Sequence, residues 1–225
     1  MNLVGKIGYK IVRFFIHFYI HNFLEFKVWG QENFIDGPKI YCSNHFSSTD
    51  PFFVITLMRE PVHMVIGPGF HVPFFRTFLK IAEQINALPE NRKNVIPTAV
   101  EYLKKGESIY IFPEGDLNDQ RSFLKFYTGL SRIYLEYPVP IIPIGIVSPI
   151  RYVKEKSINI KVGETEHKTL TVLSGKYYAN IGKPITFPDY EKMEDKNRAN
   201  ELITEEVKKK IEELVYDLKI NKFWS

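Results

Sequence analysis

The sequence predicts an α/β fold: a single domain with a mixed, largely parallel central sheet flanked by helices, preceded by an N-terminal amphipathic membrane-associated helix. Three observations predict it. Strand-type runs alternate with helical patterns along the chain. A length of 225 residues is enough for one well-buried core and short for two. A helical polar stripe marks the N-terminal segment, which places the helix at 1–26 and the folded domain at 27–225.

The composition is that of a folded protein and limits its partners. Apolar residues make up 44% and charged residues 25% of the chain. Thirty basic against 26 acidic residues give a net charge of only +4, and no recognition motif for nucleic acid is present, so no nucleic-acid partner is predicted. The mild positive charge suits an anionic membrane surface. The single cysteine, Cys42, excludes an intramolecular disulfide and fits a reducing compartment.

The segment 7–26 resembles a signal peptide or a membrane span at first sight. The first 81 residues contain no alanine, so an A-x-A cleavage site is missing. Polar side chains recur every four residues, at Arg13, His17, His21 and Glu25. This spacing draws one polar stripe on a helix whose other faces are aromatic and aliphatic. A charge at mid-bilayer costs about 2.5–3.5 kcal/mol, which favours a helix lying in the membrane interface over a span. A helix packed on the protein's own core is the alternative.

Strand-type runs, rich in β-branched and aromatic residues and bounded by turn residues, lie in order at 26–34, 38–44, 62–67, 108–112, 139–147, 158–164 and 177–185. The run 108–112 is uninterrupted and apolar after Ser108, and it leads directly into a Pro-Glu-Gly turn. The run 139–147 accepts prolines near its start. Near-continuous apolar runs like these two are typical of buried strands.

Helical patterns lie between these runs, at 51–59, 74–83, 95–105, 124–136 and 197–219. Pro51 suits the first turn of the first of them, and Gly106 ends the third. The last has its apolar residues on one face and a charged outer side, which indicates a solvated surface helix. In such a fold, sites gather in loops at strand ends, and the segments 43–50 and 113–116 occupy such loops.

His45 and Asp50, five positions apart in the first of these loops, have the residue types of a proton-transfer pair. Histidine acts as a base near neutral pH, and a carboxylate on its second ring nitrogen fixes the tautomer and stabilises the imidazolium. Two structural alternatives remain open. Asp50 stands before a proline and is a good helix N-cap, and His45 could be a loop histidine with backbone partners.

Three motifs occur in order: "NH" followed by "DP" at 44–51, "FPEG" at 112–115 and "VPIIPIGI" at 139–146. With this spacing, the chain from about Val28 to Pro188 resembles the glycerolipid acyltransferase family, which includes the 1-acylglycerol-3-phosphate acyltransferases. The resemblance makes 27–225 an acyltransferase domain. It implies transfer of a fatty acyl group from acyl carrier protein or coenzyme A to a lysolipid hydroxyl, with 1-acyl-sn-glycerol-3-phosphate as the leading acceptor, in phospholipid biosynthesis.

The resemblance also assigns roles to residues. His45 becomes the general base and Asp50 its orienting partner, with no nucleophile, no cofactor and direct transfer in a ternary complex. The acceptor site falls to Arg92, Glu114 and Gly115, with Arg92 on the acceptor's phosphate. Supporting roles fall to Asn44, Pro113 and Pro143. The enzyme would work on the cytoplasmic side of a membrane as a peripheral or monotopic protein.

The chain departs from the family pattern in the third motif. Leu117 and Tyr127 stand where the family usually has an arginine and a lysine, and Asp116 adds a negative charge. Charge-assisted hydrogen bonds contribute about 1.5–3 kcal/mol each, so phosphate binding would weaken unless Arg121 or Lys125 compensates. Two alternatives follow: a non-phosphate acceptor such as an aminolipid or glycolipid, and a non-catalytic lipid-binding membrane protein.

The segment 69–80 combines aromatic residues with cations and is a candidate acyl groove or membrane contact, through Phe70, Phe74, Phe75 and Phe78. An ordinary core helix is the alternative. Other chemistries lack their motifs. No G-x-S-x-G elbow is present, and neither H-E-x-x-H nor a Cys/His cluster occurs, so neither a serine hydrolase nor a metal site is predicted. Cys42, inside a predicted strand, is expected to be an inert buried thiol.

Overall fold

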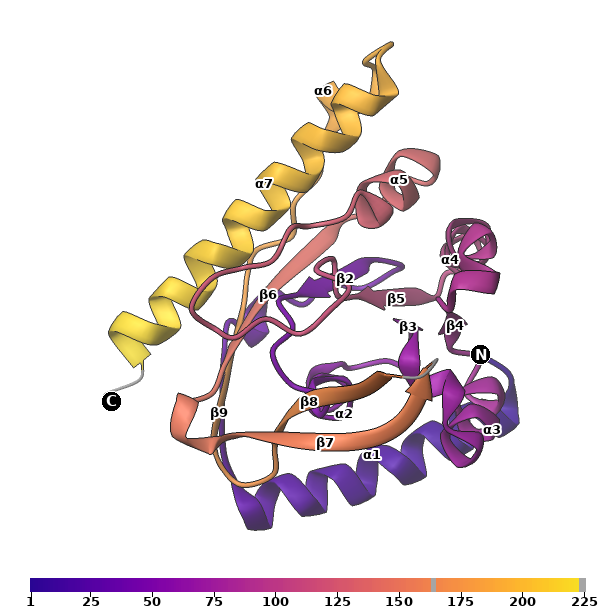
Figure 1. The fold of residues 1–225 in the computed structure, drawn as a ribbon. Coiled ribbons are helices and arrows are strands. Elements are labelled where there is room, and N and C mark those ends of the chain that lie inside the picture. The colour runs from indigo at the N-terminus through magenta and orange to yellow at the C-terminus, as the bar shows by residue number, and fades with distance from the viewer. Residues whose placement is uncertain (163–164, 223–225) are drawn as a thin grey trace.

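The computed structural model describes residues 1–162 and 165–222, with side chains except at 73–74 and 156–168. The strands of its central sheet are β1 Leu24–Trp29, β2 Ile40–Ser43, β3 Val62–Ile66, β4 Ile85–Asn86, β5 Ser108–Ile111, β6 Ile141–Val147 and β9 Gly175–Ile181. Their order is β1-β9-β6-β2-β5-β3-β4 (Figure 1). Neighbours run parallel except β6 and β9, which are antiparallel. The predicted mixed, largely parallel sheet is confirmed.

Helices cover both faces of this sheet. They are α1 Leu3–Phe23, α2 Asp50–Leu57, α3 Pro73–Ile81, α4 Val95–Lys104, α5 Gly129–Glu136, α6 Pro188–Glu191 and α7 Lys196–Asp217, with a π-helical turn at Leu218–Lys222. Short 3₁₀ turns cover Gln31–Asn33, Pro68–His71, Pro89–Asn94 and Ile150–Tyr152. Core residues of α4, α5 and α7 pack on one face of the sheet, and those of α1 and α2 pack on the other.

Strand side chains alternate between these two cores. In β5, Ile109 and Ile111 face the α4/α5/α7 layer, whereas Tyr110 faces the α1/α2 layer. All four residues of this strand are buried, because both faces of the sheet are covered. This explains why the strand has an uninterrupted apolar run instead of a polar–apolar alternation.

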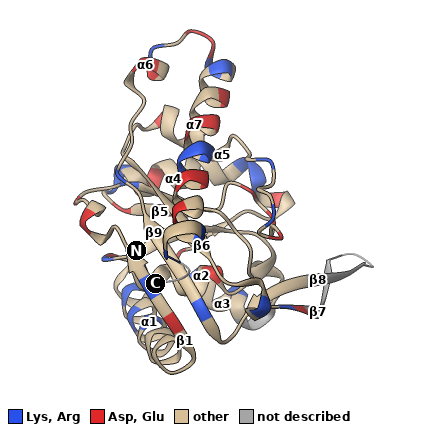
Figure 2. Ribbon diagram, turned by 90° about the vertical axis from the view of Figure 1, so that its left-hand side faces the viewer, with Lys and Arg blue, Asp and Glu red and all other residues tan. Residues whose placement is uncertain are grey.

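The helix α7 packs along β6 and has the predicted division of faces. Ile203, Val207 and Ile211 are buried against the sheet layer. Acidic and basic residues are interspersed along the rest of the helix (Figure 2). Its start is capped by the Asp195 carboxylate, which accepts hydrogen bonds from the backbone of the first turn.

The helix α1 is shorter than expected and packs on the protein by one face. It ends at Phe23, and the next residue already begins β1. Tyr9 and Ile20 are buried in the core, and the Arg13 guanidinium donates to the Thr56 carbonyl at 3.2 Å, so this cation turns toward α2. The alternative of core packing therefore holds for this face. No helix in the described part of the chain combines the length and apolar character that crossing a bilayer requires.

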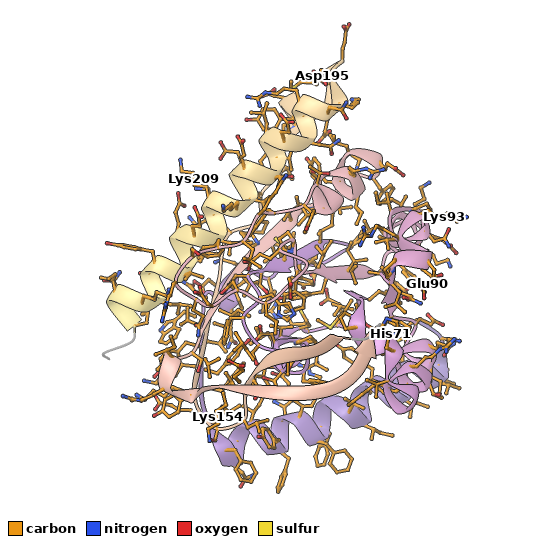
Figure 3. All side chains as sticks on the ribbon, viewed as in Figure 1. His71, Glu90, Lys93, Lys154, Asp195 and Lys209 are labelled. Carbon is orange, nitrogen blue, oxygen red and sulfur yellow. The ribbon has the colours of Figure 1, made fainter. Side chains whose placement is uncertain are left out.

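The opposite face of α1 is apolar and exposed. Its side chains recur every three or four residues, at Leu3, Ile7, Ile11, Phe14 and Phe18, and are 51–74% exposed. Figure 3 shows aromatic rings projecting from the outer side of α1, away from the body of the protein.

Three elements differ from the sequence expectation. The strand β4 was not predicted, and the strand predicted at 158–164 is part of a hairpin of β7 Val153–Val162 and β8 Thr165–Val172, outside the main sheet. Residues 163–164 lie outside the described part. The helix predicted from 124 begins only at Gly129. Its first turn is missing because Leu124 N–H donates to Glu114 and Tyr127 N–H donates to the Pro113 carbonyl.

Candidate active site

The predicted loops meet at one edge of the sheet. Because β2, β5 and β6 are parallel, the segments that follow them leave the sheet at the same edge, and the antiparallel β9 begins there. The loop after β2 carries His45, and α2 begins at Asp50. The sheet therefore brings together segments far apart in the sequence.

His45 and Asp50 form a hydrogen-bonded pair. Nδ1 of His45 lies 2.9 Å from Oδ2 of Asp50. The Asp50 side chain is fully buried, and the His45 side chain is 16% exposed. A carboxylate can only accept, so this contact places the ring proton on Nδ1. The capping alternative for Asp50 is wrong, because Thr49 occupies the N-cap and Asp50 turns its carboxylate back onto the loop.

The Asp50 carboxylate is held at both oxygens. Besides the imidazole, Oδ2 accepts the backbone N–H groups of Phe46 at 2.9 Å and Ser47 at 2.8 Å. Oδ1 accepts the hydroxyl of Tyr177 at 2.9 Å. A buried carboxylate needs such donors to stay ionised. The pair thus combines a carboxyl group fixed at both oxygens with a partly exposed imidazole.

Nε2, the second ring nitrogen of His45, has no hydrogen-bond partner among the residues that the structure describes. The ring stacks on Phe112, with centroids 4.1 Å apart and planes 21° apart. With Nδ1 protonated, Nε2 carries a free lone pair. The arrangement leaves one basic nitrogen available to a ligand.

The buried side chain of Glu114 holds the same region together through hydrogen bonds. Its side chain is only 1% exposed. It accepts His45 N–H at 2.8 Å, Leu124 N–H at 2.8 Å and the amide of Asn118 at 2.7 and 2.9 Å. Burial raises the pKa of the Glu114 carboxyl, and the two backbone N–H groups act in the opposite direction. Its contribution to acceptor binding stays a prediction, since these contacts are all with the protein itself.

The supporting residues occupy structural positions. The Asn44 amide both donates to the Ile146 carbonyl and accepts the Ile146 N–H, each at 2.8 Å, and so ties the loop to β6. Pro113 gives its carbonyl to the backbone of the following loop. Pro143 lies within β6, and its carbonyl accepts Gly182 N–H at 2.8 Å.

The expected acceptor residues are less closely joined. Gly115 has φ +66° and is exposed, and a Cβ there would lie 3.2 Å from Cε2 of Tyr127, whose ring covers it. Leu117 donates its N–H to the Asp116 carboxylate. Arg92 is exposed in the 3₁₀ turn after β4, which ends at the same sheet edge as β5. No hydrogen bond within the described residues connects Arg92 to the His45–Asp50 pair, and its phosphate-binding role stays a prediction.

The aromatic segment is divided between core and surface. Phe70 is buried in a small cluster with Leu79 and Leu88, against which Phe78 packs. Phe75 is 40% exposed, and its ring lies 6.1 Å from that of Phe52. The side chain of Phe74 lies outside the described residues. Cys42 is fully buried in β2, where burial raises the pKa of its thiol.

Several contacts escaped the sequence reasoning. The end of β8 braces the loop of His45: Ser48 N–H donates to the Leu170 carbonyl, Thr49 Oγ1 donates to the Val172 carbonyl, and Val172 N–H donates to Ser47 Oγ. Asn118 and Tyr177 were also missed. The strand of Tyr177 was predicted, but nothing local in the sequence says that it begins beside the loop after β2.

Comparisons with known proteins give matches in sequence and in fold. The Acyltransferase family model matches residues 25–147. The chain is 29% identical to the 1-acyl-sn-glycerol-3-phosphate acyltransferase of Pseudomonas aeruginosa, over 54% of this chain and 49% of that protein. It is 24% identical to the chloroplastic 1-acyl-sn-glycerol-3-phosphate acyltransferase BAT2 of Brassica napus, over 63% of this chain and 43% of that protein. The matches thus span less than half of these relatives.

The fold is similar to the crystal structure of the 1-acyl-sn-glycerophosphate (LPA) acyltransferase PlsC from Thermotoga maritima. The TM-score is 0.63 at 19% identity, over 94% of this chain and 80% of that one. This likeness concerns the fold. The family model covers more than half of the chain, including the loops of His45, Asp50 and Glu114, and the chain therefore belongs to the Acyltransferase family.

Proposed function

We propose that this protein transfers a fatty acyl group from an acyl thioester to the free hydroxyl of a lysolipid, with 1-acyl-sn-glycerol-3-phosphate as the leading acceptor. The observation that carries the proposal is the 2.9 Å contact between His45 Nδ1 and Asp50 Oδ2, which leaves Nε2 free on a partly exposed ring. The names of the relatives support the acceptor. The donor is the thioester of acyl carrier protein or coenzyme A.

The chemistry needs one base and no covalent intermediate on the protein. Nε2 of His45 takes the proton of the acceptor hydroxyl as its oxygen attacks the thioester carbonyl. The carbon–sulfur bond then breaks, and the imidazolium returns the proton to the leaving thiolate. The products are the new ester and a free thiol. Asp50 holds the imidazole in the required tautomer and stabilises its positive charge during the transfer.

The residues around Gly115 favour a second candidate for the acceptor. Tyr127, instead of a cation, covers Gly115, and Asp116 is exposed beside it. These groups suit hydroxyl or amine donors better than a phosphate. An aminolipid or glycolipid acceptor is therefore the second candidate.

A panel of acceptors tests both candidate functions. Free thiol released from an acyl thioester would be measured with purified protein and 1-acyl-sn-glycerol-3-phosphate, its dephosphorylated analogue, and lysolipids with amine or sugar headgroups. The proposal predicts release that depends on an acceptor, and fastest with the phosphate. Faster release with an amine or sugar lipid would favour the second candidate. No release with any acceptor would indicate a non-catalytic lipid-binding protein.

We also propose that the exposed apolar face of α1 docks the protein on the cytoplasmic face of a membrane, peripherally or monotopically. The face is continuous over the helix, and the neighbouring Lys6 and Lys10 are exposed, so cations lie beside it for anionic headgroups. An acyltransferase acting on lysolipids needs such access to the bilayer.

Vesicle flotation tests the docking surface. Replacing Phe14 and Phe18 with serine should move the protein from anionic phospholipid vesicles to the soluble fraction. Tyr216→Ser on α7 is the matched control, since Tyr216 is also an exposed aromatic, at 66%. Undiminished flotation of the double variant would contradict this docking surface.

A further inference from the structure

Tyr177 is a buried tyrosine that the reaction described above does not use. It lies two residues after the start of β9 and is fully buried. Its ring stacks on Phe26, with centroids 5.5 Å apart and planes 15° apart, and meets Phe53 edge-on at 5.0 Å. Phe46, from the loop of His45, lies 5.6 Å away. These rings fix the direction of its hydroxyl.

The hydroxyl donates to Asp50 Oδ1 at 2.9 Å. Burial, together with the Asp50 charge, raises the pKa of Tyr177 well above its usual value, so the group stays a donor. Three N–H donors share the other oxygen of this carboxylate. With both oxygens engaged, the carboxylate plane cannot turn about its bond to Cβ without losing a hydrogen bond.

We propose that Tyr177 is a positioning residue, whose hydroxyl holds the Asp50 carboxylate in the orientation that presents Oδ2 to Nδ1 of His45. Its catalytic consequence rests on the proposed function, whereas the positioning itself does not. The contact joins β9 to the first residue of α2, 127 residues earlier in the chain. Through this contact the start of β9 helps to orient the imidazole of His45.

The chain offers a matched control in the next residue. Tyr178 lies on the other face of the sheet, and its hydroxyl donates to Glu25 Oε1 at 2.9 Å. Tyr177→Phe and Tyr178→Phe each remove one phenolic oxygen from neighbouring positions of one strand. Tyr177→Phe keeps the ring and therefore its packing on Phe26 and Phe53.

The first measurement is an NMR titration of the His45 imidazole, which needs no substrate. Without the Tyr177 hydroxyl, the Asp50 carboxylate is free to turn, so it presents Oδ2 to Nδ1 less well and the imidazolium loses part of its stabilisation. The titration midpoint should therefore move to lower pH in Tyr177→Phe, and stay in place in Tyr178→Phe. In an Asp50→Asn background, Tyr177→Phe should add no further shift, because the hydroxyl acts through the carboxylate.

An unchanged midpoint in Tyr177→Phe, or a shift that persists in the Asp50→Asn background, would overturn the proposal. The second measurement is acyl transfer. Tyr177→Phe should lower kcat about tenfold with little change in KM, and move the acidic limb of kcat/KM to lower pH. Full activity in this variant would also overturn it. If the wild type transfers no acyl group to any acceptor, the proposed function fails, and the titration alone decides the positioning role.

Discussion

Replacing Asp50 with asparagine separates the charge of this residue from its hydrogen bonds. The amide oxygen can take the place of Oδ2 and keep its three donors: the imidazole and the N–H groups of Phe46 and Ser47. The amide nitrogen then faces the Tyr177 oxygen, which can accept. The three N–H donors keep an acceptor, and only the buried O–H of Tyr177 loses its own. Asp50→Asn should therefore fold, at a cost of about 1–3 kcal/mol for that one unpaired donor. Apart from this hydrogen bond, only the negative charge is lost.

The magnitude follows from the geometry of the pair. Nδ1 and Oδ2 are 2.9 Å apart, and the centres of charge of an imidazolium and the carboxylate lie about 4 Å apart. At an effective dielectric constant of about 20, this attraction is worth about 4 kcal/mol. Because the imidazolium forms only as the proton is transferred, most of that energy stabilises the transition state. The expected loss in kcat is about a thousandfold, at about 1.4 kcal/mol per factor of ten.

The assay compares initial rates of thiol release with thermal unfolding of the same preparations. Asp50→Ala serves as the contrast, because it leaves the buried N–H groups of Phe46 and Ser47 without an acceptor, at about 1–3 kcal/mol each. This variant should be both inactive and destabilised. If Asp50→Asn retains activity within about threefold of the wild type, or unfolds as early as Asp50→Ala, the reasoning is refuted.

Three further predictions concern stability. Asn44→Ala should lower the free energy of unfolding by about 2–6 kcal/mol in urea, because the buried N–H and carbonyl of Ile146 each lose a partner. Gly115→Ala should cost about 1–2 kcal/mol in the same experiment, since φ is +66° there, whereas the exposed ring of Tyr127 can move aside. Burial lowers the pKa of His63 from 6.5 to about 4. Between these two pH values the unfolded chain binds a proton at this residue and the folded protein does not. Stability should therefore fall as pH drops from about 6.5 toward 4, and the slope measured between pH 7 and 5 should flatten in His63→Gln.

Local patterns predicted the parts of the site that are local in sequence. The apolar run at 108–112 and the spacing of His45 and Asp50 are visible without any long-range information, because strand burial and loop length are set by neighbouring residues. The resemblance of three ordered motifs then related these segments to each other. The largely parallel sheet brings them to one edge, as the alternation of strands and helices predicted.

Contacts that depend on the order of the strands in the sheet could not be predicted from local sequence patterns. Tyr177 meets Asp50 only because β9 lies between β1 and β6, parallel to β1 and antiparallel to β6, and no nearby residue indicates that order. Asn118 was assigned no role from the sequence, and its amide donates two hydrogen bonds to the Glu114 carboxylate. The helix expected from 124 begins later because Glu114 uses the backbone N–H of Leu124.

The sequence also did not indicate which face of α1 packs against the rest of the protein. Spacing alone grouped Arg13 with the water-facing polar stripe, whereas its guanidinium meets the Thr56 carbonyl of α2. The pattern of a helix gives the relative angles of its side chains, and the docking partner decides which angle is buried. The aromatic side chains of Phe14, Phe15 and Phe18, by contrast, are exposed, and the interfacial role of the helix stays a prediction.

The most direct test of the central claim is acyl transfer by His45→Ala, measured as thiol release from an acyl thioester with 1-acyl-sn-glycerol-3-phosphate. The ring is partly exposed, and the loop backbone is held by Glu114 and Asp50 without it, so the variant should fold. We expect folded protein with transfer reduced by a factor of about 10² to 10⁴, the usual contribution of a general base. A folded His45→Ala variant that transfers acyl groups at the wild-type rate would contradict the assignment of His45 as the base.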